Sequence, residues 1–191
     1  MADVKISELP AASALVSGDL FPAVQDDGGL VTRKATAAQI GDYVRGLAGT
    51  VRQVVSATTS ADVVVFGTTW TNTGLSVAIT PTSASSKVLI LASQSLRMLR
   101  VGIGAEGGLR LLRASTVILA YSEEQFAFNK TETTGDANIG LVAPVMFLDS
   151  PATAGAVTYS LQMRGATADD QVRAQFYGGS ASSIVAMEIA A

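Results

Sequence analysis

Hydrophobic and polar positions follow two different patterns along this chain, and the change lies near residue 50. Residues 20–24 and 30–34 are short apolar segments joined by an acidic, glycine-bearing turn, which predicts a β-hairpin. Thr36 and Gln39 have the spacing of a capping box, and apolar residues then follow at helical intervals. The pattern therefore predicts a short helix that begins after Thr36 and is ended by the glycines at 46 and 49.

From Val51 onward the helical spacing disappears and alternation of apolar and polar residues takes over. Alternating segments and more continuously apolar runs are separated by clusters of turn-forming residues. The alternating segments are 75–79, 157–164 and 172–177, and the apolar runs, which predict strands buried on both faces, are 87–92, 116–121, 141–148 and 183–189. We expect a mainly β fold: an antiparallel β-sandwich or jelly roll, preceded by a small N-terminal anchor with a short hairpin and one short helix.

These patterns divide the chain into residues 1–49 and residues 50–191. The first segment is too small to bury a core of its own, so it is expected to dock on the following domain, on its symmetry mates or on another protein. Strands that are apolar on both faces imply that the second face meets a neighbouring subunit. A three-fold assembly is one common arrangement, although the pattern does not count subunits.

Composition strengthens the expectation of an oligomer. Hydrophobic residues make up 48% of the 191 residues and charged residues only 15%, against about 25% in ordinary soluble domains. No apolar run approaches the ~20 residues of a membrane-spanning helix, and the N-terminus lacks the order of a secretory signal. We therefore expect a self-associating protein without membrane insertion.

The absence of two residue types excludes several kinds of chemistry. The chain has no Cys and no His, which removes disulfides, thiolate nucleophiles, Ser-His-Asp catalysis and the usual zinc sites. A net charge of −3 argues against a basic nucleic-acid surface. Gly102–Gly107 matches a dinucleotide fingerprint, but the residues after it favour a strand over the required helix. We expect no enzyme activity, no cofactor and no metal, and a glycine-rich loop between two strands at this motif.

Four arginines flank that glycine-rich motif. If residues 96–100 and 110–114 paired across it, Arg97 would face Arg113 and Arg100 would face Arg110, and such like-charge pairs are destabilising. The alternatives are a different strand pairing, ion pairs across a subunit boundary, or an anionic glycan. The candidate residues for intersubunit ion pairs are Arg97, Arg100, Arg110, Arg113, Glu123 and Glu124.

The remaining candidates are acidic pairs and aromatic residues. Glu123–Glu124 and Asp169–Asp170 are the acid pairs that carboxylate-based glycan cleavage would need, but adjacent strand residues point to opposite faces, so we interpret them as solvated loop charges.

Residues 122–140 form the longest irregular segment. Its candidate receptor contacts are Phe126, Phe128, Lys130 and Glu132; the alternative is that both Phe side chains anchor the loop to its own domain. Trp70 is expected to pack under a loop.

Two groups of motifs resemble known virus proteins. Ile6-Ser-Glu-Leu-Pro-Ala-Ala-Ser13, residues 18–25 and residues 32–40 resemble the N-terminal segment of bacteriophage tail-fibre and other virion proteins. Residues 69–81, 85–90, 147–151 and 187–189 resemble a C-terminal β-domain of phage fibres. The resemblance implies a non-enzymatic homotrimer of the virion, assembled in the cytoplasm of a host bacterium and held by other virion proteins through residues 1–49. The anchor residues would be Ile6, Leu9, Leu20, Phe21, Val24, Ile40 and Tyr43.

The chain departs from long fibres because it has no repetitive shaft. The resemblance therefore favours a short tail fibre or a baseplate-attached fibre that contributes to attachment at the host surface, with a surface glycan as a candidate partner. Alternatives are a head fibre or decoration protein, or a carbohydrate-binding module without particle attachment. A glycan depolymerase is disfavoured, because the regular short repeats of a long β-helix are absent.

Overall fold

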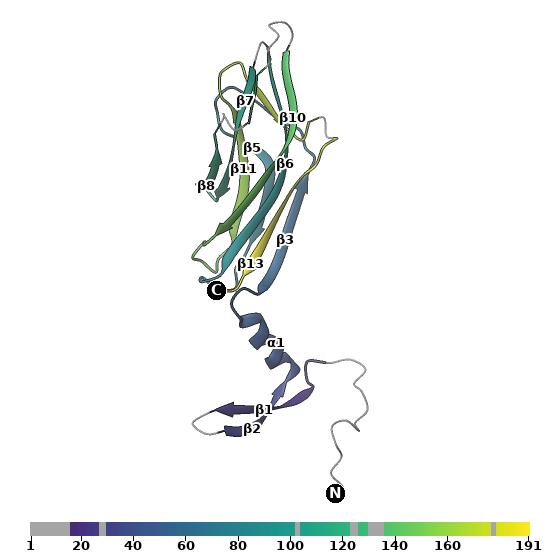
Figure 1. Ribbon diagram of the computed structural model, residues 1–191, viewed down its shortest axis with the longest axis vertical. Coiled ribbons are helices and arrows are strands. Elements are labelled where there is room, and N and C mark those ends of the chain that lie inside the picture. Colours follow the sequence, from purple (N-terminus) through teal and green to yellow (C-terminus); the bar gives the residue numbers. More distant parts are fainter. Residues whose placement is uncertain (1–15, 27–29, 102–103, 123–125, 130–135, 177–178) are drawn as a thin grey trace. The chain divides into compact units, whose positions relative to one another are not determined.

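The computed structural model describes residues 16–26, 30–101, 104–122, 126–129, 136–176 and 179–191. The chain divides into two compact units, residues 1–50 and residues 51–191. Figure 1 shows the described elements, which are antiparallel strands and one short helix.

The first unit contains the predicted hairpin and helix. Strands β1 (Leu20–Asp26) and β2 (Leu30–Thr36) pair over their whole length. Helix α1 (Ala37–Gly46) follows directly, and its capping box is complete: Thr36 Oγ1 accepts from the Gln39 amide at 3.1 Å, and Gln39 Oε1 accepts from the Thr36 amide at 2.8 Å. Gly49 takes the left-handed conformation beyond the helix end, at φ 81°. The predicted start and end of the helix are confirmed.

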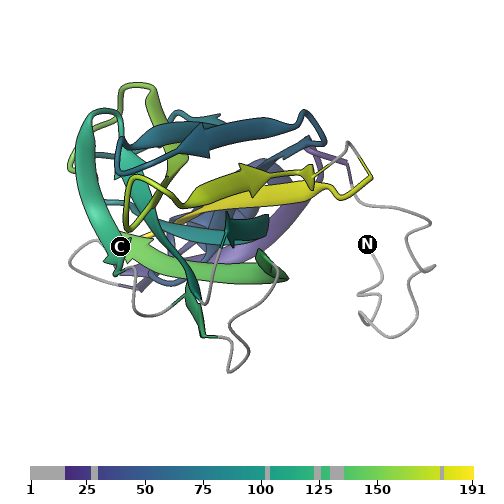
Figure 2. The same ribbon diagram turned by 90° about the horizontal axis from the view of Figure 1, so that it is seen from above.

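The second unit is a sandwich of two antiparallel sheets, as Figures 1 and 2 show from two directions. The β6 sheet contains β3 (Val51–Thr59), β4 (Val63–Phe66), β6 (Lys87–Val101), β10 (Asp136–Asp149), β12 (Gln171–Ala174) and β13 (Ser182–Ile189). The β11 sheet contains β5 (Thr71–Ile79), β7 (Gly104–Arg113), β8 (Thr116–Tyr121) and β11 (Val157–Gly165), with β9 (Ala127–Asn129) paired to β7. The predicted mainly β, antiparallel sandwich is confirmed.

Strand β6 is the centre of its sheet. On one side it pairs with β10 along almost its full length, from Val88 to Val101. On the other side it pairs first with β13 and then with β12. Buried Gln94 donates to Ser182 Oγ at 2.9 Å, and this side-chain hydrogen bond ties β6 to the start of β13.

The core lies between the two sheets and is built from alternate residues of their strands. From β6 it takes Ile90 and Met98, and the β11 sheet contributes residues such as Leu75, Leu111 and Leu161, all nearly fully buried. Their neighbours in sequence point away from the core, as the two-residue period of a strand requires. The interior therefore needs only one face of each sheet.

Within the single chain the continuously apolar strands are buried on one face at most, and burial of the second face by a neighbouring subunit stays a prediction. In β13 and β10 buried residues alternate with half-buried or exposed ones, and all of β8 is half-buried or exposed. Apolar residues such as Val142 and Met146 of β10 stay exposed. The continuous apolar runs therefore combine a core face with a second apolar face that the described residues of this unit leave partly exposed.

Two segments predicted as loops contain strand. β7 begins at Gly104, inside the glycine-rich motif. Gly107 is closely packed, because a Cβ atom there would lie 2.9 Å from Met98 Sδ and 3.2 Å from the Arg164 carbonyl oxygen. Within residues 122–140, β9 is a short strand and β10 begins at Asp136. The start of β7 could not be predicted from the alternation of apolar and polar residues, because glycine has no apolar side chain.

Residues 96–100 and 110–114 do not pair with each other. Arg97 lies opposite Gly140 on β10 and Arg173 on β12, whereas Arg110 lies opposite Gln162 and Ala120. The two segments belong to different sheets. The strand pairing therefore differs from that hairpin, which was one of the stated alternatives.

Gly165 offers a test of the close packing at the end of β11. A Cβ atom there would lie 2.7 Å from Asp170 Cβ and 3.0 Å from the Gly67 carbonyl oxygen, and a backbone oxygen moves aside less readily than a side-chain tip. We expect Gly165→Ala to lower the free energy of unfolding by about 1–3 kcal/mol. Urea unfolding followed by tryptophan fluorescence measures it.

Gly140→Ala is the matched control, because nothing lies within 4 Å of the Cβ position at Gly140 in β10. It should leave stability unchanged or raise it slightly. Equal effects of the two substitutions would contradict the packing described here.

Candidate functional site

The helix of the first unit presents its apolar side chains to solvent. Ile40, Tyr43, Val44 and Leu47 are all exposed, Tyr43 at 71%, and no residue of α1 is buried. Their spacing of three and four residues places them on one stripe of the helix. A helix of ten residues is marginally stable by itself and gains most of its stability from packing.

A groove of about 640 Å³ lies between this helix and the hairpin. Arg33 and Lys34 of β2 line it together with Gln39, Ile40 and Tyr43 of α1. Cationic groups beside an apolar helix surface suit a partner segment that is apolar and carries acidic residues.

The predicted anchor residues are only partly within the described side chains. Ile40 and Tyr43 line the groove, Leu20 is exposed and Phe21 is half-buried. Val24 lies in β1, but its side chain lies outside the described residues, as do Ile6 and Leu9.

The four candidate arginines occupy separate places. Arg97 Nε donates to Asn138 Oδ1 at 2.6 Å, and its guanidinium lies 3.7 Å from the centre of the Phe176 ring. Arg100 lies opposite Ala137 on β10. Arg110 and Arg113 lie on β7 in the other sheet, and Glu123 and Glu124 lie outside the described residues.

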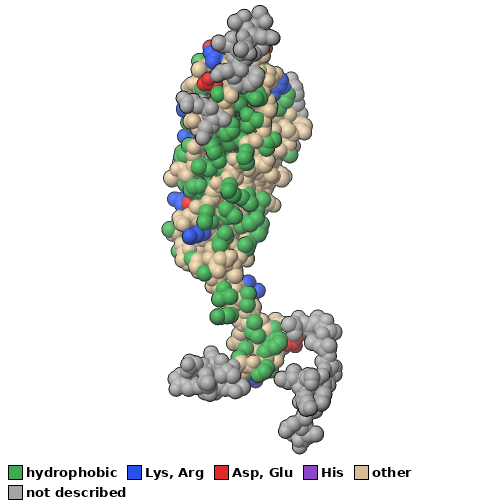
Figure 3. All heavy atoms as spheres, viewed as in Figure 1, with side chains coloured by type: hydrophobic (Ala, Val, Ile, Leu, Met, Phe, Trp, Pro, Cys, Tyr) green, Lys and Arg blue, Asp and Glu red, His purple; other side chains and the backbone are tan. Residues whose placement is uncertain are grey.

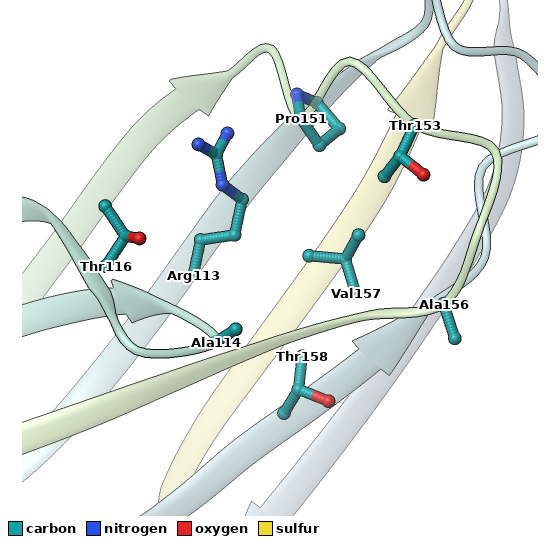
Figure 4. A pocket seen from close by; sticks show the side chains of 8 residues that line it. All are labelled: Arg113, Ala114, Thr116, Pro151, Thr153, Ala156, Val157 and Thr158. Atoms are coloured by element: carbon teal, nitrogen blue, oxygen red, sulfur yellow. The ribbon is translucent and has the colours of Figure 1, made fainter.

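Arg113 is part of a cluster of side chains around Asp149, a buried residue at the end of β10. Its Nη1 lies 3.0 Å from Asp149 Oδ1, and the Tyr159 hydroxyl donates to Asp149 Oδ2 at 2.8 Å. Burial, together with the hydrogen bond to Asp149, raises the pKa of Tyr159 above its ordinary range. The pocket in Figure 4, about 330 Å³, lies beside Arg113 and is lined by small side chains such as Thr116, Thr153 and Thr158. The cluster ties the 149–156 turn to β7 and β11.

A second acidic group, Glu188, organises the turn before β6. Glu188 is fully buried, and it accepts hydrogen bonds from the Thr82 amide at 2.8 Å, Thr82 Oγ1 at 2.7 Å and Gln53 Nε2 at 2.7 Å. Burial raises the pKa of Glu188, but these hydrogen bonds outweigh it and bring the pKa down to about 2. The carboxylate therefore holds the 80–86 turn against β3 and β13.

The interpretation of Asp169–Asp170 as solvated loop charges is wrong for Asp170. Its side chain is fully buried, and it accepts from the Thr167 amide and hydroxyl at 2.8 and 2.9 Å and from the Glu106 amide at 3.3 Å. Asp170 thus joins the 165–170 turn to β7. Sequence reasoning also missed Glu188 and Asp149 as turn organisers, because their donors belong to other strands and turns.

The candidate receptor loop is described only in part. Phe126 is half-buried and meets Tyr121 edge-on, with ring centres 5.8 Å apart, which is the geometry of a loop anchor. Phe128 lies in β9, but its side chain lies outside the described residues, as do Lys130 and Glu132.

Trp70 packs against the side chains of two arginines, whereas the sequence predicted packing under a loop. The guanidinium carbons of Arg110 and Arg164 are 4.3 and 4.6 Å from the centre of its ring. Arg110 donates to Gln162 Oε1, and Gln162 in turn donates to Asn72 Oδ1 at 2.8 Å. Burial and the nearby Arg164 lower the pKa of Arg110. A network of stacked and hydrogen-bonded planar groups therefore crosses β5, β11 and β7.

Among the described residues, no group of three or more His, Cys, Asp or Glu side chains is placed to hold a metal ion. Among the same residues, no helix has the length and apolar character needed to cross a membrane. The geometry defines a class: an antiparallel β-sandwich with turns held by buried carboxylates, and a separate hairpin–helix unit with an uncovered apolar stripe.

Comparisons with known proteins assign no family, since no family model and no curated protein matches the chain. Among solved structures it is similar to VP2 of infectious bursal disease virus in a subviral particle, with 14% identity and a TM-score of 0.37 over 96% of this chain and 41% of that one. A structure of the Gx strain gives 12% identity and a TM-score of 0.34, over 96% and 40%. The chain spans about two fifths of the length of these structures, and a likeness this weak carries no inference about function.

Glu188 predicts a specific dependence of stability on pH. Its pKa in the folded chain is about 2, below the ordinary 4.5, so the unfolded chain takes up the proton first as pH falls. The stabilisation is complete above pH 4.5 and is lost between pH 4.5 and pH 2. We expect Glu188→Gln to cost about 1–3 kcal/mol at pH 7, with the difference from wild type shrinking across that window.

Chemical unfolding at a series of pH values measures this difference. Asp136→Asn, at an exposed position of β10, controls for general charge effects and should differ little from wild type at any pH. A Glu188→Gln deficit that stayed constant from pH 6 to pH 2 would contradict the assignment.

Proposed function

We propose that this chain is a structural component of a virus particle, and more narrowly a short homotrimeric tail fibre or baseplate-attached fibre of a bacteriophage. Residues 1–49 attach it to other virion proteins, and the β-sandwich contributes to attachment at the host surface. The proposal includes no catalytic step, no cofactor and no nucleic-acid contact.

The apolar stripe of α1 is the observation that carries the proposal. Ile40, Tyr43, Val44 and Leu47 are exposed, and no residue of the helix is buried within the described chain. A segment that folds into a capped helix and a hairpin without a core of its own is suited to docking on a larger structure. The resemblance of residues 6–13, 18–25 and 32–40 to phage virion proteins supports a particle as that structure.

Attachment to a host surface is the second part of the proposal. The Trp70 network supports it, because aromatic rings beside planar polar groups suit the flat faces and hydroxyls of sugars. Phe126 is less suited to this role, since it packs against Tyr121. A free carbohydrate-binding module remains the alternative, and so does a head fibre or decoration protein.

A substitution in α1 tests particle attachment. We expect Tyr43→Asp in the full chain to reduce incorporation into particles at least about tenfold, because an aromatic anchor in an interface is worth about 2 kcal/mol or more. Quantitative immunoblotting of purified particles measures incorporation, and immunoelectron microscopy of wild-type particles distinguishes tail from head.

Asp42→Asn is the control on the same helix, because Asp42 is exposed and pairs only locally with Arg45. It should be incorporated like wild type. If Tyr43→Asp were also incorporated like wild type, the helix would not be the anchor. If Tyr43→Asp lost binding to host-surface glycan but was still incorporated into particles, the first unit would bind the glycan and the β-sandwich would attach to the particle.

A further inference from the structure

The β6 sheet has a second apolar surface on the side away from the core. The strand registers place three rows of four residues there, one residue in each row from β10, β6, β13 and β3. We call these residues the apolar face: Leu148, Leu89, Met187 and Val54; Met146, Leu91, Val185 and Ser56; Pro144, Ser93, Ser183 and Thr58.

The apolar face is uncharged and uncovered. Eight of its twelve residues are hydrophobic, the other four are Ser or Thr, and none is Lys, Arg, Asp or Glu. Met146 is 72% exposed, Val54 55% and Leu148 48%. In Figure 3 hydrophobic side chains cover much of the visible surface of residues 51–191, and Lys and Arg lie toward its margins.

The outward surface of the β11 sheet is polar by contrast. Along β11 the residues that point away from the core are Thr158, Ser160, Gln162 and Arg164, and Arg110 lies beside them on β7. The sandwich therefore has one polar outer surface, which suits contact with water, and one apolar outer surface, which suits contact with protein. The surface that is suited to contact with another protein is therefore that of the β6 sheet.

We propose that the apolar face packs against a second copy of this chain. An uncharged surface is complemented by another uncharged surface, and every copy of this chain carries such a surface. Two copies can therefore meet there without repulsion between like charges and without burying an unpaired charge. The share of charged residues, 15% of the chain, fits a protein whose outer surface is partly interior in the assembly. The inference rests on the homo-oligomer in the proposed function and not on attachment to a particle.

The copies meet through side chains and not by extending the sheet. Among the described strands β10 pairs only with β6, so its far edge is open. Pro144, near the middle of β10, has no amide hydrogen to give to a neighbouring strand, which blocks continuous edge pairing there. The exposed side chains of Val142, Met146 and Leu148 are then the part of β10 that a copy contacts.

The face supplies part of the area that a stable contact needs. Four strands about 4.8 Å apart and three rows about 6.8 Å apart cover on the order of 400 Å². A standard interface takes about 800 Å² from each partner, so the face provides about half of that area and residues around it provide the rest.

Methionine oxidation of the purified, full-length wild-type protein tests the inference directly. Hydrogen peroxide oxidises accessible methionine, and Met146 is 72% exposed in the single chain whereas Met98 and Met163 are buried. We expect Met146 to oxidise roughly tenfold or more slowly than free methionine, because a second copy covers it. Peptide mass spectrometry measures each site. Oxidation of Met146 at the rate of free methionine would overturn the inference.

A charge placed on the face gives a second test. Met146→Arg should leave the fold intact, since the side chain is exposed in the chain, but it should shift the native mass toward one chain. Val117→Arg is the matched control, because Val117 is an exposed apolar residue of β8 in the other sheet, and its native mass should stay that of wild type. Light scattering after size exclusion gives the mass, and circular dichroism verifies the fold.

The outcomes separate this inference from the proposed function. If the wild-type protein is an oligomer but Met146 oxidises freely, the face is not the interface, and the fibre proposal stands with a different one. If Met146 is protected and Met146→Arg dissociates the oligomer while particles still fail to incorporate the wild-type chain, the interface is supported and the particle role is wrong. If the wild-type chain is a monomer, both the interface and the homotrimer are overturned.

Discussion

Strand β6 is the constraint on which the rest of the sandwich depends, because β10, β13 and β12 all pair with it. Its even-numbered residues, such as Ile90 and Met98, fill the core, and its odd-numbered residues Leu89 and Leu91 form the apolar face. A slip of one residue would exchange these sets. Hydrophobicity alone discriminates weakly between the two registers, since both faces are apolar. The buried hydrogen bond from Gln94 to Ser182 supplies the missing specificity.

Most of the fold could be predicted from the sequence, because its signals are local. The capping box at Thr36 and the alternation in residues 157–164 specify a helix start and a strand without reference to distant residues. Pattern reading failed where glycine replaces apolar residues, as at Gly104–Gly107. The continuous apolar runs indicated that several strands have a second apolar face, but only the strand registers show that β10, β6, β13 and β3 bring these faces together.

Glu188 and Asp149 could not be predicted as buried carboxylates, because residues of other strands and turns hold them. Glu188 is held by residues 82 and 53, and Asp149 by Arg113. Nothing local distinguishes these acids from solvated ones, whereas the apolar stripe of α1 is visible from its spacing alone. The sandwich thus has turns held by buried carboxylates, and apolar side chains are exposed on α1 and on the β6 sheet.

Sedimentation equilibrium of the full-length wild-type protein over a range of concentrations tests the central claim most directly. The account predicts a defined oligomer, with a mass of about three times 19.6 kDa if it is the proposed trimer. A single species of 19.6 kDa at every concentration would contradict it, because the apolar face would then be open to water in the native protein.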